Sequence, residues 1–316
     1  MKKIADINNI LGIERFGDRI ACFTNSSLKN DYADYIVYVV VDEFFMSLSG
    51  GEVLLYQQNN RSSFNVLTTN NELTIIDGSY SIYGAFKDEH RFVVINVPEK
   101  SYYALDLNTL KLQNLNFLFN SSFSTENYLC QRKKSLIEVL NIKSKNIDTF
   151  DLQEYLDSDK DGSDKIVGIY EEYLYVRIKS GALISINITN GVKEIINEQI
   201  GRVELFANKL YSITGYSFKE LDANTGEILK EVSIEPLVEA YDFRPTGEHK
   251  VYEDCIFFMS SGKPGMVAVF NRSTLKFQEM IILEGMIPVG QDNLIWHEDK
   301  LFALDAGKTL HIFEKE

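Results

Sequence analysis

The sequence predicts an all-β chain folded as a β-propeller of four-stranded antiparallel blades. Short runs rich in Val, Ile, Tyr and Phe alternate with Asn, Asp, Gly and Ser, which is typical of strands and tight turns. One strand–turn–strand pattern recurs with spacings of 35 to 49 residues. A repeat of that length accommodates four strands, as in propeller blades. Because closed all-β folds often exceed 200 residues, we expect one domain over residues 1–316.

The repeat is clearest at residues 209–232, where the strands KLYSIT, FKELD and EILKEV are separated by the turns GYS and ANTG. Similar copies occupy residues 91–115, 128–150, 173–196 and 255–280. An acidic or amide residue closes the middle strand of every copy, namely Asp106, Asn141, Asn187, Asp222 and Asn271. Such side chains accept hydrogen bonds from the next backbone amides, and Gly191 and Gly226 supply the positive φ that ends the turn.

The last copy is incomplete, because KLFALD at residues 300–305 and TLHIFE at residues 309–314 match only the first two strands. An unpaired outer edge would invite aggregation. We therefore expect the N-terminal segment KKIADI to close the ring by pairing residues near 2–8 with residues near 308–314. Removing the first ten residues should then lower thermal stability sharply.

The blade count follows from the ends of the middle strands. Six of these ends are Asp106, Asn141, Asn187, Asp222, Asn271 and Glu314, and a seventh is expected near Asn70. We therefore expect seven blades. Extra strand-like segments in the first 70 residues (RIACFT, YIVYVVV, EFFMSLS and EVLLYQ) leave eight blades as the alternative. Helical patterning is confined to the short segment LQEYL at residues 152–156.

The segment ELDANTGEIL at residues 220–229 resembles the repeat of pyrroloquinoline-quinone-type propellers, in which Leu-Asp-x-x-Thr-Gly links the last two strands of a blade. WD-repeat propellers are similar in shape, although their Gly-His and Trp-Asp signatures are absent here. The resemblance implies the fold and not the chemistry. Quinoprotein blades usually carry a Trp after this turn, whereas this chain has Trp296 alone. We therefore expect no quinone cofactor.

The chain carries 46 acidic and 32 basic residues, for a net charge of −14. An acidic surface disfavours nucleic acid and anionic membranes and favours a basic protein partner. The longest apolar run, at residues 35–41, is far shorter than the roughly 20 residues of a membrane helix. The N-terminal segment does not resemble a secretory leader, and the three cysteines lack metal-ligand spacing. These features predict a cytoplasmic protein.

The segment DSDKDGSD at residues 157–164 is the one candidate metal site. Calcium loops place oxygen ligands at alternate positions and Gly at the sixth, which Asp157, Asp159, Asp161 and Gly162 match. The twelfth position is Gly168, where an EF-hand has a bidentate Glu. A Ca²⁺ site is therefore one interpretation, and a solvated acidic linker is the other.

Three further residues are candidate binding residues. Asp242 and Arg244 begin a polar segment that would line the face on which propellers bind ligands, or would form an ordinary connection. His297 lies in WHEDK beside a predicted hairpin turn, where a solvated loop residue is the alternative. The sequence contains neither a Gly-x-Ser-x-Gly elbow nor a phosphate-binding Gly loop, so no catalytic residue is assigned.

Together these observations predict a protein-binding propeller with an acidic surface, of which an immunity or inhibitor protein against a basic toxin would be one version. An enzyme or small-molecule binder that uses the central channel is an alternative. A scaffold subunit of a larger assembly is a third hypothesis.

Overall fold

The computed structural model describes residues 1–29, 31–41, 45–50, 52–58, 63–78, 80–85, 91–96, 99, 101–106, 109, 111–118, 122–124, 127–133, 135–156, 163–260, 262–288 and 293–315. Within these residues the strands form seven four-stranded sheets and one three-stranded sheet. The prediction of an all-β chain with multiple four-stranded antiparallel sheets is confirmed, and one sheet departs from it with three strands, one of which pairs in parallel. The described residues form eight sheets, so the expected count of seven is replaced by the alternative of eight.

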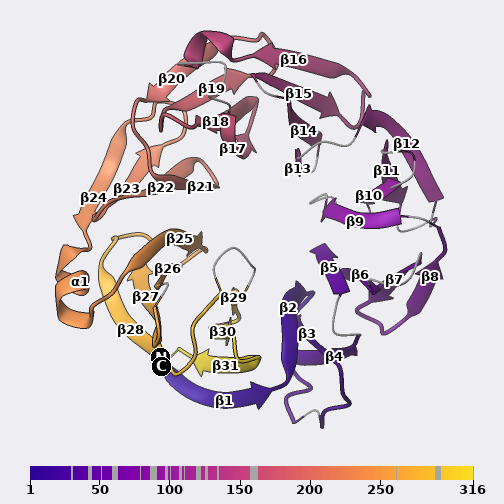
Figure 1. Ribbon diagram of the computed structural model, residues 1–316, viewed down its shortest axis with the longest axis vertical. Coiled ribbons are helices and arrows are strands. Elements are labelled where there is room, and N and C mark those ends of the chain that lie inside the picture. The colour runs from indigo at the N-terminus through magenta and orange to yellow at the C-terminus, as the bar shows by residue number, and fades with distance from the viewer. Residues whose placement is uncertain are drawn as a thin grey trace. The chain divides into compact units, whose positions relative to one another are not determined.

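The chain divides into two compact units, and each is described by itself. The N-terminal unit comprises Asn8–Lys133 and Ile137–Thr149, and the C-terminal unit comprises Met1–Ile7, Lys134–Leu136 and Phe150–Glu316. In each unit the sheets contact one another through their first strands, β2 with β5, β5 with β9 and β9 with β13 in one, and β17 with β21 and β21 with β25 in the other (Figure 1).

The N-terminal unit holds three whole sheets and most of a fourth. Their strands are β2 (Ile10–Phe16), β3 (Arg19–Thr24) and β4 (Ile36–Val40); β5 (Phe45–Gly50), β6 (Val53–Gln58), β7 (Phe64–Thr68) and β8 (Leu73–Ile76); β9 (Tyr80–Ala85), β10 (Arg91–Asn96), β11 (Ser101–Asp106) and β12 (Lys111–Leu118); and β13 (Ser122–Ser124), β14 (Tyr128–Lys133), β15 (Leu136–Asn141) and β16 (Ile147–Asp151). The four extra segments of the first 70 residues are β3, β4, β5 and β6. Of these, β5 and β6 belong to the sheet whose middle strand is expected to end near Asn70, and β3 and β4 form the eighth sheet with β2.

The C-terminal unit holds four sheets. Their strands are β17 (Ser163–Tyr170), β18 (Tyr173–Ile178), β19 (Leu183–Asn187) and β20 (Lys193–Asn197); β21 (Arg202–Phe206), β22 (Lys209–Thr214), β23 (Ser217–Asp222) and β24 (Ile228–Ser233); β25 (Pro245–Val251), β26 (Cys255–Ser260), β27 (Gly265–Asn271) and β28 (Phe277–Leu283); and β29 (Leu294–His297), β30 (Lys300–Leu304) and β31 (Thr309–Glu314) with β1 (Lys2–Asn8). The expected helical segment is a 3₁₀ turn, η1 (Gln153–Tyr155), whereas the helix α1 (Glu235–Tyr241) was not foreseen.

The hydrophobic core lies between neighbouring sheets, as β26 illustrates. Ile256 and Phe258 join Phe218 in one cluster, whereas Phe257 joins Trp296 in another. Successive residues of a strand point to opposite faces, so both faces of β26 are buried and its sequence is apolar from Cys255 to Met259. Neither described helix is long and apolar enough to cross a membrane.

The predicted turn chemistry is present at the ends of the five middle strands that close with Asp or Asn. In five sheets the closing Asp or Asn accepts hydrogen bonds through its Oδ1 from backbone amides two or three residues ahead. The donors are Thr109 to Asp106, Lys143 and Ser144 to Asn141, Thr189 and Asn190 to Asn187, Asn224 and Thr225 to Asp222, and Thr274 to Asn271. These residues therefore act in folding the turn.

The predicted closure is confirmed, because β1 is the fourth strand of the sheet and pairs with β31. His311 of β31 links the two strands, with Nδ1 at 2.6 Å from Asp6 Oδ1 and Nε2 at 3.1 Å from Asp305 Oδ2. The amino group of Met1 also pairs with Glu279. His311 is thus a buried residue that bridges β1 and the turn after β30.

We expect acid to weaken the attachment of β1. Burial alone would raise the pKa of Asp6, but hydrogen bonds with Lys3 and His311 hold it below its ordinary value. A carboxyl with a lowered folded pKa contributes stability above its unfolded pKa and loses it as the pH falls through the folded value. The contribution at pH 7 is up to about 1 kcal/mol, because Asp6 is half-exposed.

Asp6→Asn should therefore lower the melting temperature at pH 7 and lose that effect below about pH 4. The matched control is Asp148→Asn, which removes an exposed carboxylate from β16. A difference between wild type and Asp6→Asn that stays constant from pH 7 to pH 3 would contradict the assignment.

Candidate binding pocket

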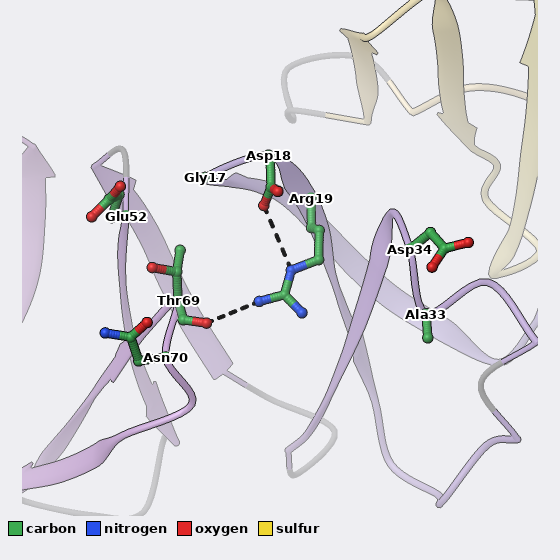
Figure 2. A pocket seen from close by; sticks show the side chains of 8 residues that line it. All are labelled: Gly17, Asp18, Arg19, Ala33, Asp34, Glu52, Thr69 and Asn70. Atoms are coloured by element: carbon green, nitrogen blue, oxygen red, sulfur yellow. Dashed lines mark hydrogen bonds and ion pairs between the residues drawn. The ribbon is translucent and has the colours of Figure 1, made fainter.

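A polar pocket of about 600 Å³ lies in the N-terminal unit, between the sheet of β2–β4 and the sheet of β5–β8. The β2–β3 turn, the approach to β4, the β5–β6 turn and the β7–β8 turn surround it. Its lining residues are Gly17, Asp18, Arg19, Ala33, Asp34, Glu52, Thr69 and Asn70 (Figure 2).

Gly17 allows the two sheets to approach at this point. It has φ of +61°, and a Cβ there would lie 2.8 Å from Thr69 Cγ2. Both the left-handed backbone and the close approach therefore favour glycine. A backbone hydrogen bond joins the β7–β8 turn to the β5–β6 turn, since Thr69 N donates to Glu52 O at 3.0 Å.

Arg19 is the cation of the pocket, and its side chain is 22% exposed. Its Nη2 donates to the carbonyl oxygen of Thr69 at 3.0 Å, and its Nε lies 3.7 Å from Asp18 Oδ1 (Figure 2). The guanidinium thus links a turn of one sheet to a turn of the next.

Three exposed carboxylates, those of Asp18, Asp34 and Glu52, surround this single guanidinium. Figure 2 places them on separate segments around the pocket, with Asp18 alone turned to Arg19. Neither Asp34 nor Glu52 has an ion-pair partner among the described residues. The pocket therefore carries net negative charge and offers acceptors to a cationic group. In the part of the chain that the structure describes, no three His, Cys, Asp or Glu residues are placed to hold a metal ion.

The predicted site residues lie elsewhere. Asp157, Asp159 and Asp161 fall outside the described residues. Asp242 ends α1 with φ of +49°, and Arg244 Nε and Nη2 lie 3.3 Å from its carboxylate oxygens, so these two exposed residues pair with each other. They remain predicted binding residues.

His297 ends β29 and is 8% exposed, so it is buried and not the residue of a solvated loop. Its Nε2 has no hydrogen-bond partner among the described residues. His297 lies in a different sheet from β25, the strand that Asp242 and Arg244 precede, so the sheets do not bring these predicted residues together. Its predicted role in binding is unchanged by this placement.

A buried charged cluster in the C-terminal unit is structural. Glu220 is 1% exposed, with Oε1 at 2.6 Å from Lys209 Nζ and 3.3 Å from Lys230 Nζ. Tyr211 donates its hydroxyl to Glu220 Oε2 at 3.2 Å. Burial alone would raise the pKa of Glu220, but the two lysines hold it below its ordinary value. Every member is paired, so the cluster presents no group to a ligand.

A second cavity, of about 760 Å³, lies beside α1 in the same unit. It is lined largely by apolar side chains, including Val232, Leu237, Phe270, Leu275 and Phe277. Most of these side chains also belong to the core between the sheets of β21–β24 and β25–β28. This cavity is therefore a shallow extension of the core packing.

The polar pocket could not be predicted from the sequence because its residues come from separate turns. Each turn alone resembles an ordinary hairpin connection, and no spacing relates residues 17–19 to residues 33–34, 52 or 69–70. The net acidity of the chain indicated an acidic surface but not the place of a pocket.

No protein-family model and no curated protein matches the chain. Among solved structures, it is similar to BamB from Moraxella catarrhalis, with a TM-score of 0.57 and 12% identity over 99% of this chain and 97% of that one. AztD from Citrobacter koseri gives a TM-score of 0.48 and 14% identity over 76% and 72% of the two chains. The computationally designed protein Ika8 gives 0.47 and 10% over 85% and 95%.

At 12% identity the likeness to BamB shows the fold alone. It confirms the expected resemblance to propellers of the pyrroloquinoline-quinone type, and BamB is an eight-bladed member of that fold.

Proposed function

We propose that the chain is a cytoplasmic protein-binding propeller whose acidic surface binds a basic partner. The observation that supports it best is the polar pocket, where the carboxylates of Asp18, Asp34 and Glu52 lie around the single guanidinium of Arg19. In this proposal a Lys or Arg side chain of the partner enters the pocket. An immunity or inhibitor protein for a basic toxin is the concrete form of this function.

The charges of the pocket suit such a partner. Arg19 is fixed by the carbonyl of Thr69 and lies beside Asp18. Asp34 and Glu52 then remain to accept charge-assisted hydrogen bonds, which are stronger than neutral ones. The net charge of −14 adds a long-range field that would speed the encounter with a basic protein.

The test is capture of a partner from native lysate on the immobilised chain, followed by affinity measurement in rising salt. We expect the captured protein to be basic and to be released as salt screens the charges. The double variant Asp34→Asn/Glu52→Gln should weaken binding by about tenfold or more.

The matched control is Asp148→Asn/Glu239→Gln, which removes the same charge from exposed positions outside the pocket. Equal weakening by both double variants would mean that net charge, and not the pocket, governs binding. A captured partner that is insensitive to salt would contradict the proposed function.

A further inference from the structure

The sheet of β2, β3 and β4 has three strands, whereas each of the other seven sheets has four among the described residues. Its third strand, β4, is also unusual in direction, since it pairs with β3 in parallel. The connection between β3 and β4 spans residues 25–35, in place of a tight hairpin turn. No strand in the described part of the chain occupies the fourth position beside β4.

The backbone of β4 presents hydrogen-bonding groups on the side where the described residues place no strand. Ile20 N donates to Tyr35 O at 2.9 Å, and Val41 N donates to Thr24 O at 2.8 Å. Backbone groups of a strand alternate between its two sides, so the odd-numbered residues from 35 to 41 face β3. The N–H and C=O groups of Tyr38 and Val40 therefore face the other side, which we call the outer edge of β4.

The outer edge of β4 is accessible to another chain. Val40 is 55% exposed. The third strand of a complete sheet is more enclosed, as in β19, where all five residues are buried. An accessible strand edge is a template for pairing with an extended segment.

We propose that the outer edge of β4 binds an extended basic segment of a partner protein as the fourth strand of this sheet. The basic character of the segment rests on the proposed function. Ala33 and Asp34 line the polar pocket and lead directly into β4. A segment paired with β4 would therefore pass close to Asp34, and its Lys or Arg side chain would reach the pocket.

Charge selects this occupant over a second copy of the chain. Asp34 precedes β4 without an ion-pair partner among the described residues, whereas Asp31 pairs with Lys29, and each copy has a net charge of −14. Two such edges would bring like charges together, which is unfavourable. A basic strand would instead bring opposite charges together, and its backbone would hydrogen-bond with the edge groups of Tyr38 and Val40.

The probe is a fluorescein-labelled octapeptide of alternating Lys and Val, with fluorescence polarisation in low salt as the readout. A Glu-Val octapeptide tests the charge requirement. A Lys-Val octapeptide N-methylated at alternate amides tests backbone pairing without altering the protein. We expect the first peptide to bind, the second not to bind, and the third to bind about tenfold more weakly or worse.

Val40→Pro should weaken Lys-Val binding to a similar extent, and Val40→Thr should leave it near the wild-type value. The Val40 N–H does not serve the β3–β4 ladder, and proline is tolerated at such edge positions. Circular dichroism and the melting temperature would confirm that each variant is folded.

Loss of binding in Asp34→Asn/Glu52→Gln with no effect of Val40→Pro or N-methylation would overturn the strand addition and leave the proposed function intact. Absence of Lys-Val binding to the wild type would overturn this inference, and the lysate capture would then judge the proposed function separately. Concentration-dependent dimerisation abolished by Val40→Pro would assign the edge to a second copy and overturn the basic partner.

Discussion

Removal of residues 1–7 is expected to lower the melting temperature by about 6 °C. The truncation deletes most of β1 and exposes the edge of β31. It also removes the Asp6–His311 contact and the pairing of Met1 with Glu279. The loss of several hydrogen bonds and of packed side chains corresponds to roughly 4 kcal/mol in the free energy of unfolding, which sets the size of the shift.

Addition of a synthetic peptide with the sequence of residues 1–7 should restore part of the lost stability, because it can reoccupy the same edge. A scrambled peptide of equal composition is the control, and calorimetry gives both melting temperatures. If the truncated chain melts at the wild-type temperature, β1 does not stabilise the sheet.

The second large effect is expected from Gly226→Ala in the clearest copy of the repeat. Gly226 and Gly191 occupy the same place in their turns. Each donates its N–H to the carbonyl of the residue closing the middle strand, Asp222 or Asn187. Their φ values are +70° and +78°, so alanine should destabilise either position by about 1 kcal/mol through backbone strain.

Gly226 and Gly191 differ in their surroundings. A Cβ at Gly226 would lie 2.1 Å from the carbonyl oxygen of Ile196 in β20, whereas a Cβ at Gly191 would have Phe150 Cε1 at 3.9 Å as its nearest neighbour. Gly226→Ala must therefore displace main chain of the adjacent sheet, and we expect a total loss of about 3 kcal/mol. Denaturant unfolding of both variants measures the difference. Equal losses would show that strain in the turn is the only cost.

The features that the sequence predicts correctly are those set by local sequence. Two such features are the Asp and Asn residues that close the middle strands and the missing strand after TLHIFE. Each could be predicted because it depends on a few neighbouring residues. Only part of the role of Gly226 could be predicted. Its positive φ follows from the turn, whereas its contact with Ile196 depends on the packing of two sheets.

The direction of β4, the helix α1 and the partners of His311 could not be predicted from local sequence. The run YIVYVVV is apolar throughout, so it has no alternation to fix the direction or partner of β4. The eleven-residue connection before it was the available signal, because parallel neighbours require a long crossover. The helix α1 spans seven residues, too few for a periodic pattern. His311 finds its partners at Asp6 and Asp305, and no sequence spacing relates Asp6 to it.

The pairing of β1 with β31 has a consequence for biosynthesis. The two strands are separated by about 300 residues, so β1 leaves the ribosome long before its partner exists. At translation rates of about 5 to 20 residues per second, β1 waits for roughly 15 to 60 seconds. During that time Lys2, Lys3 and Asp6 keep the segment charged and protect it from premature pairing. The sheet that joins the two distant strands is therefore among the last to be completed.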